Sequence, residues 1–339
     1  MLRQQVGEFE PEYLALESEP EVSNLGLAGS EMSIGPGSAR SLAEISVDVV
    51  LNGIVGFAGL SATVGALQVG NVVALANKES LVAGGEWVMN IAPRNRIIPV
   101  DSEHSAIFQC LDGRRGEEIA EILLTASGGP FFEKQKSELV HAGPEDALKH
   151  PTWEMGAKIT IDSASMMNKG LEVMEAHHLF GVSYDDVKVV VHRQSVVHGG
   201  AIFNDGSLIM HAALPDMRLP ISYGLLYPER VDVGAERVGF DNASWTFDEP
   251  RNDVFRCLPL AIEAGRSGGA YPVALNAANE VVVQAFLEKR IKFLQIADLI
   301  EEVLEIVPDL GEMQSMEAIE SVDRWARDEA ERLTDGLAR

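Results

Sequence analysis

Residues 1–47 form an acidic, Gly/Ser-rich segment with one short helical pattern. After it, apolar runs of strand length alternate with amphipathic stretches over the rest of the first third of the chain. A buried-strand pattern starts at Asp48, and similar runs recur with helical periodicity between them. The expected strands are 48–55, 72–76 and 96–100. One helix is expected to end near Val69, a second to begin near Glu79 and a third near Glu103. This alternation is typical of a doubly wound, Rossmann-like parallel sheet.

The pattern changes from about residue 119, where short strands are interleaved with helices and long loops. Such a mixture indicates an α+β unit with a partly antiparallel sheet. The expected strands are 122–125, 158–161, 187–192 and 199–203. Residues 252–334 follow a helical period with breaks near Gly268, Lys292 and Pro308, which indicates a helical bundle. We therefore expect three domains: a partial Rossmann-like domain (1–118), an α+β domain (119–250) and a helical domain (251–339).

Composition and charge narrow the classes of function. The 339 residues are 46% hydrophobic, enough for a sizeable core, and the formal net charge of −25 argues against a nucleic-acid partner. No apolar run reaches the length of a membrane span, and the N-terminus lacks the pattern of a targeting segment. Cys110 and Cys257 show neither disulfide nor metal-binding spacing. We expect a cytoplasmic protein with no membrane partner.

Two acidic residues follow the apolar strand at 96–100. Asp101 and Glu103 are two positions apart, so on an extended segment they point to the same side. Ligands bind at the carboxyl ends of strands in open α/β sheets, and hard oxygen ligands favour Mg²⁺ or Mn²⁺. The alternative is a solvated strand end with Glu103 capping a helix.

A second polar cluster occurs where we expect a strand to end at Asp162 and a helix to begin. Ser163 is a candidate N-cap residue of that helix. Asn168 and Glu172 are four positions apart and share a helical face, with Lys169 alongside. A helix start of this composition suits a phosphate group, and Glu172 is in reach of a metal. The alternative is an ordinary capped amphipathic helix.

Two loops complete the candidate chemistry. Ser127 opens a Ser-Gly-Gly turn after an apolar strand, and such turns expose backbone N–H groups and a hydroxyl to an anion. The loop at 150–156 starts with His150-Pro and carries Trp153 and Met155, which suits a lid over a ligand. The alternatives are a simple turn and simple packing.

Seven segments, taken together and in this order, closely resemble the 1-deoxy-D-xylulose-5-phosphate reductoisomerase family. They are ALANKESLVAGG (74–85), PVDSEHSAIFQCL (99–111), LLTASGGPF (123–131), HPTWEMGAKITIDSASMMNKGLEVMEA (150–176), HRQSVVH (192–198), PDMRLPI (215–221) and LNAANEVVVQAFL (275–287). The resemblance runs from about residue 48 to the C-terminus. It implies the NADPH-dependent rearrangement and reduction of 1-deoxy-D-xylulose 5-phosphate to 2-C-methyl-D-erythritol 4-phosphate, in isoprenoid precursor biosynthesis, by a homodimer that uses Mg²⁺ or Mn²⁺.

The resemblance also implies a role for individual residues. The metal ligands would be Asp101, Glu103 and Glu172. Contacts to the reacting part of the substrate would come from Lys78, Ser102 and Glu103. The phosphate would be bound by Ser127, His150, Ser163, Asn168 and Lys169, under the lid residues Trp153 and Met155. The NADPH site would be lined by Asn77, Glu79 and Gly156.

The chain departs from the family in its nucleotide-binding part. The family's Gly-x-Thr-Gly-Ser-x-Gly turn, which holds the NADPH pyrophosphate, follows no strand here, and its nearest counterpart is residues 29–35, where Glu31 would repel phosphate. Residues 1–47 resemble the later half of that unit, so we expect an incomplete, N-terminally truncated sheet lacking roughly 50 residues. Two explanations stay open. One is a misplaced start codon or gene fragment; the other is a real truncation, leaving an inactive homologue that binds divalent metal and sugar phosphate without hydride transfer.

A second departure lies in the HRQSVVH segment. The family usually has proline where this chain has Arg193. Arginine adds a positive charge and frees the backbone φ angle that proline would fix. We therefore expect a change in local loop geometry rather than a loss of activity.

Overall fold

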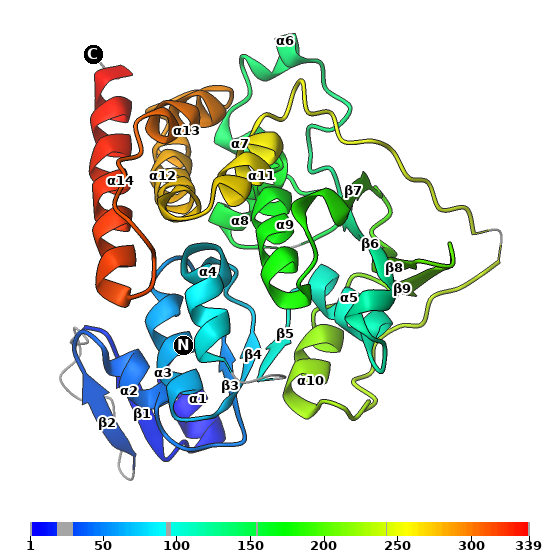
Figure 1. The fold of residues 1–339 in the computed structure, drawn as a ribbon, viewed down its shortest axis with the longest axis vertical. Coiled ribbons are helices and arrows are strands. Elements are labelled where there is room, and N and C mark those ends of the chain that lie inside the picture. Colours follow the sequence, from blue (N-terminus) through cyan, green and yellow to red (C-terminus); the bar gives the residue numbers. More distant parts are fainter. Residues whose placement is uncertain (1, 19–29, 93–95, 154, 242, 338–339) are drawn as a thin grey trace.

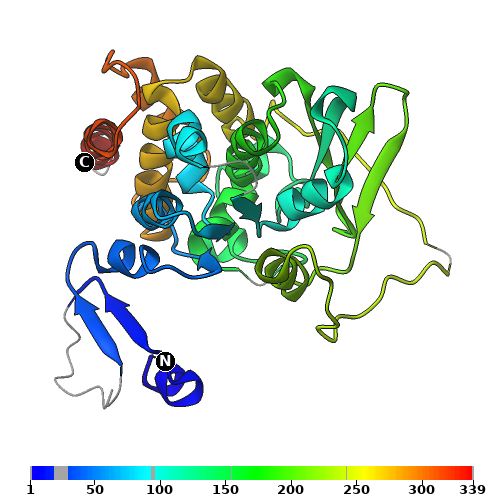
Figure 2. The same cartoon turned by 60° about the horizontal axis from the view of Figure 1, so that its bottom comes forward.

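The computed structural model describes residues 2–18, 30–92, 96–153, 155–241 and 243–337 (Figure 1). The chain begins with a small unit that projects from the body of the molecule (Figure 2). Its elements are α1 (Leu2–Phe9), β1 (Tyr13–Leu16), β2 (Glu31–Ile34) and α2 (Ser38–Ala43). β1 and β2 form a parallel two-stranded sheet. Of the segment 29–35, Gly29 lies outside the described residues and most of the remainder forms β2.

A three-stranded parallel sheet follows, as the strand–helix alternation predicted. Its elements are β3 (Val49–Asn52), α3 (Gly59–Gln68), β4 (Val72–Leu75), α4 (Glu79–Ile91) and β5 (Ile97–Pro99). The strand order is β3-β4-β5, and the apolar residues of β4 and β5 are mostly buried. Because the strands are parallel, the chain segments after β4 and β5 reach the same edge of the sheet.

The second sheet is mixed, which confirms the predicted α+β unit. Its strands are β6 (Ile119–Ala126), β7 (Val187–Val191), β8 (Val197–Phe203) and β9 (Leu208–Ala212), in the order β7-β6-β8-β9. β6 and β7 are parallel, and the other pairs are antiparallel. α5 (Ser102–Leu111) packs on β8. A Cβ atom at Gly199 of β8 would lie 3.2 Å from the carbonyl oxygen of Glu103, so glycine permits this close approach.

The strand predicted at 158–161 is wrong: these residues belong to helix α8 (Ala157–Ser165). An apolar run of four residues with β-branched members does not separate a strand from a helix. Two contacts between residues four apart are helical in character. Thr160 Oγ1 donates to the carbonyl of Gly156 at 2.8 Å, and Lys158 Nζ lies 3.0 Å from Asp162 Oδ2.

α9 (Met167–Phe180) follows α8 after a single left-handed residue, Met166, with φ 64°. Ser163 therefore lies inside α8 and does not cap a helix, which corrects the prediction. Shorter elements are η1 (Gly116–Glu118), α6 (Lys136–Leu139), α7 (Pro144–Ala147), η2 (Tyr184–Asp186) and α10 (Arg218–Leu226). β9 and α10 were not predicted.

The predicted C-terminal helical bundle is confirmed. It consists of α11 (Cys257–Ser267), α12 (Ala270–Leu287), α13 (Gln295–Glu305) and α14 (Met316–Leu337). α12 is buried along most of its length and packs against α14, α13, α4 and α8 (Figure 1). One hydrophobic core includes buried residues from Ala43 to Ala330, so the boundaries predicted at 118/119 and 250/251 stay predictions. Among the described helices, none is long and apolar enough to cross a bilayer.

Candidate active site

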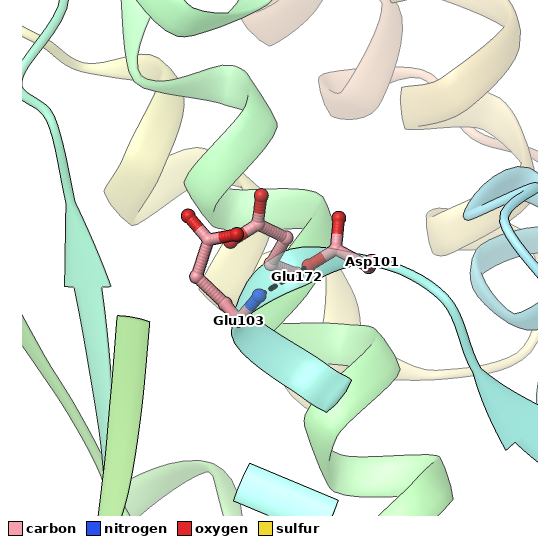
Figure 3. A group of neighbouring side chains, drawn as sticks. All are labelled: Asp101, Glu103 and Glu172. Atoms are coloured by element: carbon pink, nitrogen blue, oxygen red, sulfur yellow. Dashed lines mark hydrogen bonds between the residues drawn. The ribbon is translucent and has the colours of Figure 1, made fainter. Parts of the chain in front are cut away.

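Three carboxylates converge just after β5, and we call them the carboxylate end of the site: Asp101, Glu103 and Glu172. Asp101 is the N-cap of α5, and its Oδ1 accepts the backbone N–H of Glu103 at 3.1 Å and of His104 at 3.4 Å. Glu103 lies in the first turn of α5, and Glu172 approaches from α9. One oxygen from each carboxylate lies within 4.8 Å of the other two (Figure 3).

The geometry that brings these residues together differs from the one expected from sequence. Strand alternation does not align Asp101 with Glu103, because the helix has already begun at Ser102. The alternative with Glu103 as the helix cap is also wrong, since Asp101 is the cap. As the cap, Asp101 is held through Oδ1 by two backbone N–H groups, which leaves Oδ2 for other partners.

Two buried lysines balance the charge of the carboxylate end. Lys78 Nζ donates to Asp101 Oδ2 and lies 3.9 Å from Glu172 Oε1. Lys169 Nζ donates to Glu103 Oε1 at 3.0 Å and also to Glu172 Oε2. Buried charges require such partners, because an unpaired one loses its hydration without compensation.

Electrostatics at the carboxylate end favour a cation. Burial, and then the neighbouring Glu103, raise the pKa of Glu172 to about 8. Burial also opposes ionisation of Asp101, yet the Lys78 ammonium and His104 hold the pKa of Asp101 well below its usual range. Glu172 therefore keeps its proton near neutral pH, beside two other carboxylates. A divalent cation bound among them would favour the ionised form of Glu172. The all-oxygen donor set suits a hard cation.

His104 supports the carboxylate end from within the core. Its Nε2 donates to the backbone carbonyl of Glu172 at 2.9 Å, while its Nδ1 lies 3.1 Å from Asp101 Oδ1 and 3.2 Å from Glu175 Oε2. Burial opposes protonation of the ring, but Glu175 and Asp101 raise the pKa of His104 to about 9. The protonated ring thus links α5 to α9, the two helices that carry the carboxylates.

Uncharged donors form the opposite part of the site, which we call the serine end: Ser127, His150 and Ser163. Ser127 Oγ lies 2.9 Å from His150 Nε2. His150 Nδ1 accepts the backbone N–H of Thr152 at 3.2 Å and of Trp153 at 2.9 Å. The proton of the neutral ring therefore lies on Nε2, which donates to Ser127. Burial, and then Arg193, lower the pKa of His150, which favours this neutral form.

A cavity of about 230 Å³ joins the two ends. It is lined by every residue predicted for the metal, the substrate and the lid: Lys78, Asp101, Ser102, Glu103, Ser127, His150, Trp153, Met155, Ser163, Asn168, Lys169 and Glu172. Ser102 Oγ donates to Glu103 Oε2 at 2.5 Å, and Asn168 Nδ2 donates to Glu172. Asn168 and Lys169, which the resemblance assigns to the phosphate, therefore contact the carboxylate end in this structure. Their role toward phosphate stays a prediction.

A second cavity of about 390 Å³ adjoins the first, and four residues line both: Ala76, Lys78, Ile159 and Asn168. The residues predicted for the cofactor, Asn77, Glu79 and Gly156, all line this second cavity. Asn77 Nδ2 donates to Glu79 Oε2 at 2.9 Å, so both side chains are fixed at the turn after β4. The structure thus places the predicted cofactor residues beside the predicted substrate residues.

Some contributors to the site were given no role from sequence. Lys158 Nζ donates to Glu79 Oε1 at 2.9 Å and pairs with Asp162, whose Oδ1 accepts from Asn279 at 2.9 Å. The strand interpretation of 158–161 hid the spacing of Lys158 and Asp162, which is an ordinary helical pair. Met217, just before α10, lines the first cavity. Its segment PDMRLPI carries the resemblance, but the sequence alone does not show that Met217 reaches this cavity from a distant part of the chain.

Comparison with known proteins agrees with these observations. The family model described as 1-deoxy-D-xylulose 5-phosphate reductoisomerase matches residues 1–85. The models of the reductoisomerase C-terminal domain and the DXP reductoisomerase C-terminal domain match residues 97–180 and 212–329. The reductoisomerase of Pelotomaculum thermopropionicum is 48% identical over 336 residues, covering 96% of this chain and 87% of the relative. That of Chloroherpeton thalassium is 49% identical over 315 residues, covering 90% and 81%.

Solved structures show the same likeness. A DOX-P reductoisomerase in complex with NADPH, fosmidomycin and magnesium superposes with a TM-score of 0.92 at 36% identity, covering 98% of this chain and 88% of that one. The enzyme from Zymomonas mobilis in complex with NADPH gives 0.89 at 39% identity, again covering 98% and 88%. Sequence motifs, fold and site geometry agree with these matches along nearly the whole chain. The chain therefore belongs to the 1-deoxy-D-xylulose 5-phosphate reductoisomerase family.

Proposed function

We propose that this chain converts 1-deoxy-D-xylulose 5-phosphate to 2-C-methyl-D-erythritol 4-phosphate with NADPH and a divalent cation. The main support is that one cavity joins a cluster of three carboxylates to the uncharged serine end. Solved relatives are complexes with NADPH, with magnesium and with fosmidomycin, which supports both cofactors. Within the described residues, nothing favours the alternative of an inactive homologue.

Asp101, Glu103 and Glu172 would hold the divalent cation, Mg²⁺ or Mn²⁺. When bound, the cation supplies Lewis-acid polarisation of the substrate's carbonyl and vicinal oxygens. Lys78 and Lys169 now hydrogen-bond the same carboxylates. Once those carboxylates have a metal partner, the two ammonium groups would be free to donate to substrate oxygens, and this is their proposed role.

The serine end would bind the substrate's phosphate. Ser127 Oγ accepts from Gly129 N at 3.2 Å and from His150, so its own hydrogen is available to an anion. Ser163 and Asn168 line the same cavity, and with Lys169 they complete the proposed phosphate contacts. Binding at a group remote from the reacting carbons holds the substrate in a productive orientation.

Two further sets of residues would serve the hydride transfer. Asn77, Glu79 and Gly156 would line the NADPH site in the adjoining cavity. Trp153 and Met155 belong to a loop whose backbone is tied to His150, so phosphate binding and loop closure would be linked. The rearrangement would give an aldehyde that NADPH then reduces, and a closed loop would exclude water from it.

A homodimer is proposed from the surface near β9. This strand is an edge of the mixed sheet, and two apolar side chains on it, Leu208 and Met210, are exposed. An exposed apolar patch beside an unpaired edge is a common oligomer interface. Light scattering of Met210→Glu should show monomers where the wild type shows dimers.

A cytoplasmic location is also proposed, because Cys110 and Cys257 are both free.

The direct test is turnover by the purified chain. NADPH oxidation should require both 1-deoxy-D-xylulose 5-phosphate and Mg²⁺ or Mn²⁺, and mass spectrometry should identify 2-C-methyl-D-erythritol 4-phosphate. Metal and substrate binding without any NADPH oxidation would support the inactive alternative instead.

A further inference from the structure

Arg193 lies beside the serine end for a topological reason. β6 and β7 are parallel neighbours, and Ala126 pairs with Val191 at their carboxyl ends. The chain leaving β7 therefore runs next to the turn that leaves β6. His192 N donates to the carbonyl of Ala126 at 2.7 Å, which continues the pairing by one residue and delivers Arg193 to that turn.

The Arg193 guanidinium binds the backbone of the turn. Its Nη1 donates to the carbonyl of Gly129 at 2.7 Å and of Ser127 at 3.3 Å. The guanidinium carbon also lies 5.8 Å from the centroid of the Phe132 ring. One cationic side chain thus bonds both ends of the three-residue turn that presents the Ser127 hydroxyl.

Two of the three residues of the turn are glycines. Gly128 and Gly129 have φ angles of 76° and 64°, a region that glycine adopts readily and other residues rarely. A Cβ atom at Gly129 would lie 2.8 Å from the carbonyl of Ser163, so the turn passes directly against α8. A segment of two glycines has high conformational freedom when unbound, and charge-assisted hydrogen bonds to its carbonyls restrict that freedom.

The residues on either side of Arg193 contact a different part of the chain. His192 Nδ1 donates to the carbonyl of Thr246 at 2.8 Å, and Gln194 Nε2 donates to that of Ser244 at 3.0 Å. These bonds anchor the loop on residues 244–246. Arg193 is thereby oriented to the opposite side, toward the turn.

We propose that Arg193 is a positioning residue for the phosphate group of the substrate. It holds the Ser127–Gly129 turn in the conformation that offers the Ser127 hydroxyl to an anion, and it adds positive charge to the serine end. In a chain with a net charge of −25, such local charge matters for an anionic ligand. The inference rests on the proposed function, because it assigns the phosphate to this end of the cavity.

The test compares Arg193→Ala and Arg193→Lys with Arg251→Ala. Arg251 is the matched control, because its Nη1 also donates to two carbonyls, those of Phe132 at 2.8 Å and Lys134 at 2.9 Å, further along the same loop. Arg193→Ala should raise KM for the sugar phosphate about 10-fold with kcat within about 3-fold, the effect of losing one charge-assisted contact. Arg193→Lys should recover most of the loss, and Arg251→Ala should leave KM unchanged.

Two further readouts separate positioning from simple packing. Calorimetric titration with inorganic phosphate should show weaker binding by Arg193→Ala than by the wild type, whether or not the chain turns over. The pKa of His150, followed by NMR, should rise in Arg193→Ala because a neighbouring cation is removed. An unchanged KM and phosphate affinity in Arg193→Ala, or an equal rise of KM in Arg251→Ala, would overturn the proposal. Absence of wild-type turnover with normal phosphate binding would contradict the proposed function alone.

Discussion

The carboxylate end and the serine end of the cavity are held in place by different interactions. At the carboxylate end, the side chains of Lys169 and Glu172 are 4% and 1% exposed, and the Lys169 ammonium donates a hydrogen bond to Glu172 Oε2. At the serine end, Ser127 and His150 are half-buried, and the ring of His150 is fixed by backbone N–H groups. One end is a network of buried charges, and the other is a set of neutral donors with separate supports.

This difference indicates how each end responds to substitution. Removing one member of a buried charge network leaves its partners unpaired, so the effects are large and shared. Removing one neutral donor loses about one hydrogen bond, so the effects are small and local. The carboxylate end should therefore control the chemical step, and the serine end should control substrate affinity.

The largest expected effect comes from Glu172→Gln. The amide cannot replace an ionised metal ligand, so kcat/KM should fall about 1,000-fold or more. The matched control is Glu117→Gln, because Glu117 is an exposed glutamate whose side chain is 73% accessible and paired only with Arg115 among the described ion pairs. Wild-type rates in Glu172→Gln would remove this residue from the site.

The pH dependence of metal binding should be the next largest effect. With a pKa of about 8, Glu172 retains a proton that the cation must displace. Mg²⁺ affinity, measured by calorimetry, should rise roughly 50-fold from about pH 6 to about pH 8 and level off above about pH 9, because binding displaces one proton. A flat profile would show that Glu172 is already ionised in the absence of metal.

The same shift has a consequence for stability. The folded pKa of Glu172 is raised from 4.5 to about 8, so its contribution to stability is complete below 4.5 and is lost as pH rises through about 8. Saturating Mg²⁺ should therefore raise the melting temperature more at about pH 8.5 than at about pH 6. A larger rise at the lower pH is the contrary result.

Ser127→Ala should show the weaker response of the serine end. Loss of one hydroxyl contact should raise KM about 10-fold and leave kcat within about 3-fold. Ser183→Ala is the control, because the exposed Ser183 hydroxyl donates to Asp186 at 2.8 Å, outside both cavities. A fall in kcat as large as that of Glu172→Gln would mean that the two ends do not differ as described.

The smallest effect is expected at the lid. Trp153→Ala should raise KM about 5-fold, because the loop loses its cover over the cavity while the catalytic groups stay in place. Trp153→Phe should recover most of this loss. Steady-state kinetics of both variants would measure it, and identical KM values for the wild type and Trp153→Ala would exclude Trp153 from the lid.

Local sequence patterns predicted a helix or strand correctly where the buried positions follow the hydrophobic period of the sequence. The strands β3, β4 and β5 are short apolar runs bounded by turns, so sequence was sufficient there. It failed at α8, because Lys158–Ile161 is too short and too β-branched to show its helical period. β9 was missed because Leu208–Ala212 is only five residues long, shows no alternation of apolar and polar residues, and includes a histidine.

The candidate site was predictable as a set of residues but not as a geometry. The sequence predicted correctly that Asp101 and Glu103 lie together, but it gave strand alternation as the reason. In the structure Asp101 is the N-cap of α5, and Glu103 lies in its first turn. The contact of Arg193 with the Ser127 turn depends on strand pairing between β6 and β7. Such contacts link residues far apart in sequence, and the sequence of each loop alone does not contain them.

We expect Asp101, Glu103 and Glu172 to form one divalent-cation site. Titration with Mn²⁺ followed by electron paramagnetic resonance tests it directly, without NADPH or substrate. The wild type and Glu117→Gln should each bind one Mn²⁺ per chain with equal affinity, and Glu172→Gln should lose that site. Equal binding of Mn²⁺ by Glu172→Gln and the wild type would show that the three carboxylates do not form this site.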